Sequence, residues 1–283
     1  MITPFKDGKV DFDRLQEQIE FQIAAGTQVL SPTGTTGESP TLTHDEQHEV
    51  IAMTVKFASG RAKVLAGTGS NSTEEALSLT RRAESVGADG ALVITPYYNK
   101  PTQEGMYEHF KKLAMSVGLP ICVYNVPGRT ARAIEPETIV RLAEFKNIAM
   151  VKEASGSMDA ASQIISRTDL TLLSGDDSLT LPFMSLGARG VVSVVANFAP
   201  NELVKLCALM NQGALEEARR IHYKMLPLSR GMLSLATNPI PVKAAMEALG
   251  RDSGEMRLPL TKLDPQNAAK VRALLVESGL LRD

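Results

Sequence analysis

The sequence predicts an α/β fold, a (β/α)8 TIM barrel followed by a C-terminal helical domain. Eight short apolar runs, rich in β-branched residues, recur along the 283-residue chain. Stretches with helical periodicity separate these runs, as expected for a parallel sheet with helical crossovers. The runs are apolar throughout, which is typical of parallel strands that are buried on both faces. Eight such units favour a closed barrel.

The predicted strands follow one another at regular intervals. The first, Ile2–Phe5, has almost no chain ahead of it, so we expect it to be either short or truncated. The other seven are Gln28–Pro32, Lys63–Thr68, Ala91–Thr95, Ile121–Asn125, Ile148–Lys152, Leu170–Leu173 and Val191–Val195.

Helices are predicted between the strands. Phe12, Leu15, Ile19 and Ile23 have the spacing of one helix face. Two helix starts carry a residue pair that fits a capping box, in which a hydroxyl and a glutamate three positions later satisfy each other's backbone amides. These pairs are Thr43 with Glu46 and Ser72 with Glu75.

From about residue 215 the pattern changes to consecutive helical stretches without strands. These stretches are Glu216–Leu235, Pro241–Leu249 and Pro265–Ser278. We therefore predict a catalytic barrel over residues 1–215 and an α-helical domain over residues 216–283.

A doubly wound open sheet is the alternative architecture. It is disfavoured because no G-x-G-x-x-G motif follows an early strand: after Gly67 and Gly69, Ser72 stands where the third glycine is needed. No P-loop is present either. His44 and His48 lie four apart on a helix, but Asp45 replaces the glutamate of a zincin and no third metal ligand is evident.

Composition excludes several functional classes. The net charge is −2, from 30 basic and 32 acidic residues, and no basic block indicates a nucleic-acid partner. No apolar run approaches the length of a membrane span, and the N-terminus lacks the features of a signal peptide. Cys122 and Cys207 are expected to be reduced thiols in the cytoplasm.

Lys152 is the strongest candidate for chemistry because it is a charged residue at the end of an apolar strand. Burial at the mouth of a barrel is expected to lower the pKa of the amine, and a neutral amine can attack a ketone to form a Schiff base. The alternative is an ion pair with Glu153 or another neighbouring acid. The spacing slightly favours the nucleophile.

Other chemically capable residues follow the C-terminal ends of the same series of strands, where barrel enzymes place their active sites. Thr35 and Thr36 lie in a Gly-Thr-Thr-Gly turn, which could bind an anion or be an ordinary turn. Tyr98 belongs to a tyrosine pair, which is more often a packing or interface feature than a catalyst. Tyr124 ends the fifth strand. Arg129 follows a Pro-Gly turn and suits a carboxylate, although an exposed charge is the simpler interpretation.

Taken together, these segments make the chain similar to the pyruvate-dependent class I aldolase superfamily of the N-acetylneuraminate lyase type. Within it, the chain resembles the dihydrodipicolinate synthase (4-hydroxy-tetrahydrodipicolinate synthase) family along essentially its whole length. The segments that carry the resemblance are Gly34-Thr35-Thr36-Gly37-Glu38, Thr95-Pro96-Tyr97-Tyr98-Asn99, Tyr124-Asn125-Val126-Pro127-Gly128-Arg129-Thr130, Val151-Lys152-Glu153-Ala154, Leu173-Ser174-Gly175-Asp176-Asp177 and Asn238-Pro239-Ile240-Pro241-Val242-Lys243.

The resemblance implies a lyase that condenses pyruvate with L-aspartate 4-semialdehyde, in lysine biosynthesis by the diaminopimelate pathway, without a metal or organic cofactor. Lys152 would form the Schiff base and Tyr124 would exchange protons, with Thr35 linking Tyr124 to Tyr98 of a neighbouring subunit. The family expectation is a homotetramer built as a dimer of dimers. Substrate would be held by Thr36, Arg129, Gly175 and Val192.

Some members of the family bind lysine as an inhibitor at a subunit interface. The matching positions here are Ser39, His44, Asn71, Glu75 and Tyr97, but Gln47 and Pro40 depart from the pattern of sensitive enzymes, so inhibition is left open. The alternative activity is that of a 2-keto-3-deoxy sugar-acid aldolase, which the Arg129 motif disfavours. A catalytically inactive barrel is disfavoured because the set of candidate residues is intact.

Overall fold

The structure is a computed structural model in which residues 1–282 are described. The chain divides into two compact units. One unit comprises Met1–Lys63 together with residues 193–282, and the other comprises Val64–Val192. The predicted domain boundary between residues 215 and 216 stays a prediction, and Asp283, the last residue of the predicted helical domain, lies outside the described residues.

A parallel sheet forms the centre of the Val64–Val192 unit. Its strands are hydrogen-bonded in sequence order, and every pairing is parallel. They are β4 (Lys63–Gly67), β5 (Gly90–Ile94), β6 (Ile121–Asn125), β7 (Ile148–Glu153), β8 (Thr171–Ser174) and β9 (Gly190–Val191). Each overlaps a strand predicted from the sequence.

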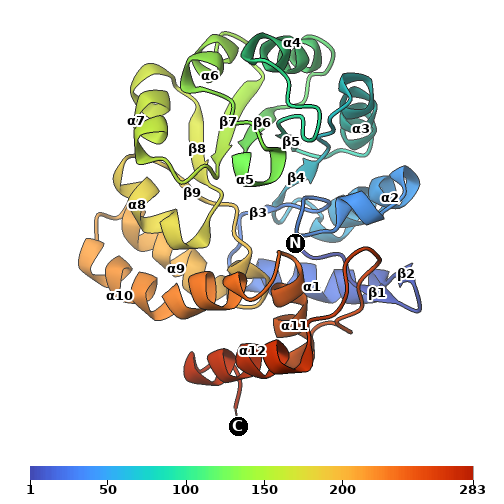
Figure 1. The fold of residues 1–283 in the computed structure, drawn as a ribbon, viewed down its shortest axis with the longest axis vertical. Helices are drawn as coiled ribbons and strands as arrows, with labels where there is room; N and C mark the ends of the chain where they lie inside the picture. Colours follow the sequence, from blue (N-terminus) through green and yellow to red (C-terminus); the bar gives the residue numbers. More distant parts are fainter. Residues whose placement is uncertain (283) are drawn as a thin grey trace. The chain divides into compact units, whose positions relative to one another are not determined.

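Helices line the outer side of these strands (Figure 1). The longer ones are α3 (Thr73–Ser85), α4 (Gln103–Ala114), α6 (Pro136–Leu142) and α7 (Met158–Arg167). Three shorter elements follow strand ends: α5 (Pro127–Thr130), η2 (Asp177–Leu179) and α8 (Thr180–Ser185).

The strands of this unit bury different side chains on their two faces, because successive residues of a strand point in opposite directions. On β6, Val123 belongs to the large apolar cluster that also contains Phe110 of α4. Cys122 and Tyr124 belong to a second cluster with residues of β4 and β5. β6 therefore has one face against the helices and the opposite face against the second cluster. We call this opposite face the interior face.

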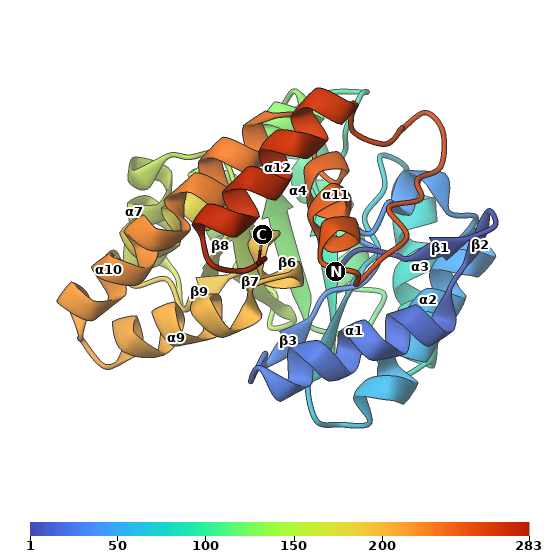
Figure 2. The same cartoon turned by 90° about the horizontal axis from the view of Figure 1, so that it is seen from below.

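The other unit is mainly helical. Its elements are β1 (Phe5–Lys6), β2 (Lys9–Val10), α1 (Phe12–Ala24), β3 (Val29–Leu30), η1 (Ser39–Thr41), α2 (His44–Ala58), η3 (Val195–Asn197), α9 (Pro200–Asn211), α10 (Leu215–Leu226), η4 (Pro227–Gly231), η5 (Met232–Ser234), α11 (Ile240–Ala248) and α12 (Pro265–Glu277). Figure 2 shows α9 and α10 running side by side within this unit.

Three predicted elements differ from the structure. The expected strand Ile2–Phe5 is wrong: β1 begins only at Phe5 and turns back to pair with β2 in antiparallel fashion. The strand predicted to end at Val195 stops at Val191. The helical stretch predicted over Glu216–Leu235 is confirmed as helical backbone but changes type: α10 ends at Leu226 and is followed directly by the π-helix η4 and the 3-10 helix η5, because Pro227 lacks the amide that an α-helix requires.

The error at the N-terminus has a physical cause. Ile2 and Phe5 are each 1% exposed. Their apolar side chains reflect this burial, which the sequence pattern cannot distinguish from that of a barrel strand. The backbone amide of Ile2, however, donates to Asn197 Oδ1 at 2.9 Å. A side chain therefore takes the place of a sheet partner.

The capping predictions are confirmed at one site and half confirmed at the other. Thr43 and Glu46 form the complete capping box at the start of α2. The Ser72 hydroxyl accepts from the Glu75 amide, but the Glu75 carboxylate accepts from the Ser70 hydroxyl.

No helix within residues 1–282 is both long and apolar enough to cross a membrane.

His109 on α4 gives the Val64–Val192 unit a predictable pH dependence. The ring is 4% exposed, and its Nδ1 lies 2.9 Å from Thr73 Oγ1. Burial lowers the pKa of His109 from 6.5 to about 4. The folded chain therefore binds fewer protons than the unfolded chain between these values, so the stabilisation is present above pH 6.5 and is lost as the pH falls to about 4.

We expect the substitution His109→Gln to remove this dependence, because glutamine does not titrate. As the pH falls from 7 to 4, the free energy of unfolding of the natural chain should decrease by about 3 kcal/mol relative to that of the variant. Urea titrations at several pH values measure it. A difference that is constant with pH would contradict the prediction.

Candidate active site

Lys152 and Tyr124 are neighbours on adjacent parallel strands. They face each other in the register of β6 and β7, near the C-terminal ends of both strands. The Nζ of Lys152 lies 3.9 Å from the centroid of the Tyr124 ring. Both residues are buried, with 9% and 7% of their surfaces exposed. An aromatic face attracts a cation, so this arrangement suits an ammonium group or a protonated imine.

The surroundings of Tyr124 are apolar. It packs in one cluster with Leu65, Leu92, Cys122 and Val126, and Met150 and Ala154 border the cluster. Burial raises the pKa of the Cys122 thiol to about 12, so this cysteine stays protonated and does not compete as a nucleophile. The amine at the strand end is thus the nucleophilic group that this face of the sheet offers.

The ion pair between Lys152 and Glu153 that the sequence left open is not formed. Glu153 is fully buried and points to the other face of β7. One carboxylate oxygen accepts from the Asn125 side-chain amide at 2.9 Å and the other accepts from the Ser155 backbone amide at 2.6 Å. The carboxylate therefore organises the strand end instead of neutralising the lysine.

Asn125 connects this carboxylate to the segment that carries Arg129. Its Oδ1 accepts from the Ile134 backbone amide at 3.2 Å, nine residues further along the chain. Within that span Arg129 lies on α5, at the C-terminal end of β6, with an exposed side chain. The pair of Asn125 and Glu153 thus fixes the base of the loop on which the guanidinium is carried.

Gly175 and Val192 lie at the ends of the next two strands. The Gly175 amide donates to the Glu153 carbonyl at 2.7 Å, and the Val192 amide donates to the Ser174 carbonyl at 2.9 Å. A Cβ atom on Gly175 would lie 2.5 Å from the Cβ of Ala154. Only glycine therefore allows β8 to end this close to the residues that follow Lys152.

The two tyrosines after β5 are directed differently from Tyr124. Tyr98 is 88% exposed and adopts a left-handed backbone conformation with φ of 72°. Tyr97 is 37% exposed. A tyrosine this exposed does not pack within the described part of its own chain, and whether Tyr98 is an interface residue stays a prediction.

Thr35 and Thr36 belong to the first unit, in the turn between β3 and η1. The turn is closed by backbone bonds from Gly37 to the Gly34 carbonyl and from Glu38 to the Thr35 carbonyl, at 3.0 and 3.1 Å. The Thr36 hydroxyl accepts from the Asn238 side-chain amide at 2.9 Å, from a residue 202 positions away in sequence. The predicted site residues are therefore divided between the two units.

The predicted effector residues are divided in the same way. In the first unit, Ser39 begins η1 and His44 begins α2 with an exposed side chain. In the second unit, Asn71 accepts at its carbonyl from Asn99, and the Glu75 carboxylate is engaged by the Ser70 hydroxyl. Whether these residues bind a ligand stays a prediction.

Comparison with known proteins gives a match over almost the whole chain. The model of the dihydrodipicolinate synthetase family matches residues 1–278. The chain belongs to this family.

Relatives in the dihydrodipicolinate synthetase family support the assignment. A 4-hydroxy-tetrahydrodipicolinate synthase of Methanococcus maripaludis strain C7 is 51% identical over 283 residues, covering 100% of this chain and 98% of the relative. The crystal structure of dihydrodipicolinate synthase from Aquifex aeolicus has a TM-score of 0.98 and 50% identity, covering 100% of this chain and 98% of that one. DHDPS from Cyanidioschyzon merolae, solved with lysine bound, has a TM-score of 0.96 and 40% identity, covering 99% and 97%.

These comparisons confirm the predicted fold class, a (β/α)8 barrel with C-terminal helices. They also confirm the predicted activity at the level of the family: a 4-hydroxy-tetrahydrodipicolinate synthase, a lyase of lysine and diaminopimelate biosynthesis. The roles of the individual residues are not tested by the comparisons.

Three residues of the site environment gained no role from the sequence, namely Asn125, Glu153 and Asn238. Asn125 and Glu153 were part of recognised segments, but a strand pattern cannot say which polar side chains pair across it. The sequence contained one indication of such pairing. The apolar run of β7 ends in two consecutive polar residues, Lys152 and Glu153, and a buried polar side chain needs a hydrogen-bonding partner.

Glu153→Ala should destabilise the fold, because the Asn125 and Ser155 donors would stay buried without an acceptor. We expect the free energy of unfolding to fall by about 3 kcal/mol, measured by urea titration. Glu137 is the matched control: its ion pair with Arg167 is exposed, so Glu137→Ala should change stability by less than about 1 kcal/mol. Equal effects of the two substitutions would refute the structural role of Glu153.

Proposed function

We propose that Lys152 is the amine that condenses with pyruvate and that Tyr124 exchanges protons with the bound substrate. The observation that carries the proposal is the position of the lysine Nζ against the Tyr124 ring at the ends of β6 and β7. The amine adds to the ketone carbon and water leaves, which gives a protonated imine. This cation withdraws electrons, so the pyruvate methyl group can lose a proton to a base and become an enamine.

The second substrate of the proposed reaction is L-aspartate 4-semialdehyde. The enamine carbon attacks the aldehyde, and the amino group of the semialdehyde then closes the ring at the imine carbon, which releases the lysine. Arg129 is proposed to hold the carboxylate of this substrate. Its position on a short helix directly after β6 supports the role, because a guanidinium binds a carboxylate with two parallel hydrogen bonds.

The pyruvate carboxylate is proposed to bind Thr36 and the backbone near Gly175 and Val192. The close approach of β8 to β7 that Gly175 allows supports a backbone site there. Thr35 would pass protons between Tyr124 and a Tyr98 from another subunit, in place of a histidine. The exposure of Tyr98 is compatible with a side chain that enters the site of a neighbouring subunit. A homotetramer built as a dimer of dimers is proposed because it is typical of the family.

Lysine is proposed as a ligand of Ser39, His44, Asn71, Glu75 and Tyr97, with inhibition left open. The support is the lysine bound to the DHDPS of Cyanidioschyzon merolae. We also propose that the protein works in the cytoplasm, where the thiols of Cys122 and Cys207 would stay reduced.

Borohydride reduction tests the proposed nucleophile. In the presence of pyruvate it should add one reduced pyruvyl group per chain, and Lys152→Ala should abolish the adduct in intact-mass measurements while the far-ultraviolet circular dichroism is unchanged. Lys224→Met, which removes an exposed ion pair with Glu202, serves as a second lysine variant and should keep the adduct. An adduct that survives in Lys152→Ala would place the chemistry on another amine.

Arg129→Ala tests recognition of the second substrate. We expect kcat/KM for aspartate semialdehyde to fall about 10- to 100-fold, because a charge-assisted hydrogen bond contributes about 1.5–3 kcal/mol. Formation of the pyruvate adduct should be unaffected. An assay with 2-keto-3-deoxygluconate runs in parallel, since faster turnover of this sugar acid would show that the proposed substrate is wrong.

A further inference from the structure

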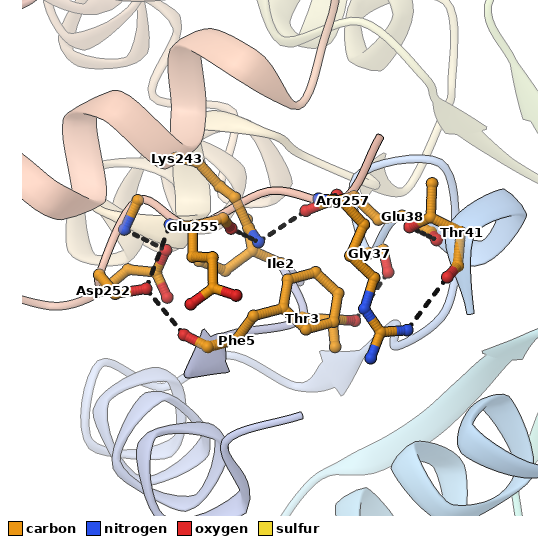
Figure 3. Close-up of polar contacts among 12 residues, drawn as sticks. Ile2, Thr3, Phe5, Gly37, Glu38, Thr41, Lys243, Asp252, Glu255 and Arg257 are labelled. Carbon is orange, nitrogen blue, oxygen red and sulfur yellow. Dashed lines mark hydrogen bonds and ion pairs between the residues drawn. The ribbon is translucent and has the colours of Figure 1, made fainter. Parts of the chain in front are cut away.

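A buried ion pair joins the turn of Thr35 and Thr36 to α11. The Lys243 Nζ lies 2.6 Å from Glu38 Oε1, and the two side chains are 1% and 0% exposed (Figure 3). The ammonium also donates to the Glu255 carbonyl at 2.7 Å and lies 4.2 Å from the centroid of the Phe5 ring. Its surroundings are thus fully arranged around a cation, although burial itself lowers the pKa of Lys243.

Glu38 closes the turn that carries the two threonines. Its backbone amide donates to the Thr35 carbonyl at 3.1 Å, and its φ of 55° lies in the left-handed region. A residue with a Cβ atom holds this conformation only where its surroundings enforce it. The buried Glu38 carboxylate holds the backbone in this conformation, because it pairs with Lys243 and accepts a hydrogen bond from the Arg257 amide at 3.4 Å.

The segment that leads into α11 contacts the middle of the turn. Asn238, two residues before α11 begins, donates to the Thr36 hydroxyl at 2.9 Å. Lys243, within α11, binds Glu38 two residues after Thr36. Two residues, one just before α11 and one within it, therefore contact the turn on either side of Gly37.

The backbone at Gly37 is packed closely against the N-terminal segment of the chain. A Cβ atom there would lie 2.9 Å from the Thr33 amide nitrogen and 3.1 Å from the Met1 carbonyl, and its carbonyl accepts from Thr3 Oγ1 at 2.7 Å. The turn is therefore closely packed on its N-terminal side and held by α11 on the other side. A change in the Glu38 anchor must therefore be absorbed within residues 34–37, which include the two threonines.

We propose that Lys243 is a positioning residue for Thr35 and Thr36, acting through its buried ion pair with Glu38. It touches no substrate. The inference rests on the proposed function for the role of the two hydroxyls. A buried ion pair often stabilises a fold no better than well-packed apolar side chains of similar volume, so stability alone is a weak reason for this pair. Fixing the geometry of the turn is a role that an apolar pair cannot perform, because dispersion contacts are not directional.

The test compares Lys243→Met with the double variant Lys243→Met/Glu38→Met. The single variant leaves a buried carboxylate without its partner and should unfold at lower urea concentration. The double variant replaces both charges by apolar side chains and should recover most of the urea midpoint. In both variants, amide hydrogen exchange of residues 34–39 should accelerate at least about tenfold relative to the amides of α9, which serve as the internal reference.

Activity provides the second measurement. Both variants should lose at least about tenfold in kcat and should show a raised KM for pyruvate, because a displacement of about 1 Å at a catalytic group costs on the order of 100-fold. Borohydride should still trap pyruvate on Lys152 in both variants at saturating pyruvate. The matched control is Lys224→Met, which removes an exposed ion pair with Glu202 and should change none of these quantities.

Exchange at residues 34–39 decides the proposal independently of the proposed function. If these amides accelerate no more than those of α9, or match the natural chain in the double variant, Lys243 serves stability alone and the proposal is overturned. If the natural chain neither traps pyruvate nor turns over semialdehyde, the proposed function fails, while the exchange result still decides whether Lys243 positions the turn.

Discussion

The alternation of side chains along β6 and β7 is the constraint on which the candidate chemistry depends. Because the two strands pair in parallel with Tyr124 opposite Lys152, the residues that follow must face the other way. The amine therefore shares a face with an aromatic ring, and the Glu153 carboxylate shares the opposite face with Asn125. A slip of one residue in this register would exchange the two sets and bring an acid to the position of the nucleophile.

The two faces divide the work between chemistry and support. On the interior face, an apolar cluster around Tyr124 keeps competing groups away from the amine, and Cys122 stays protonated. On the helix face, Glu153 and Asn125 satisfy backbone amides at residues 155 and 134, so two loops start from fixed points. The loop with Arg129 is one of them. The candidate reactive side chains at the strand ends thus lie beside buried residues that hold these strand ends in place.

The sequence predicts most of the fold because buried parallel strands have a composition that helices and loops rarely share. The bounds of β6 agree residue for residue, and the box of Thr43 and Glu46 marks the start of α2. The errors arise where burial and strand structure separate. Ile2 is buried without a strand partner, and at Pro227 the helical backbone changes from α10 to the π-helix η4 although the periodicity predicts one uniform helix. Lys152 was found because a charge in an apolar run is conspicuous, whereas the partners of Glu153 and Lys243 required coordinates, since their contacts join residues far apart in sequence.

The span between Glu38 and Lys243 also determines when the threonine turn can be completed during synthesis. Both of its anchors on the side of α11, Asn238 and Lys243, follow the turn by about 200 residues in sequence. At about 5–20 residues per second, the ribosome needs roughly 10–40 s to proceed from the one charge to the other. Throughout this interval the nascent chain carries the glutamate without its ammonium partner, so this part of the candidate site can form only after Lys243 has been synthesised.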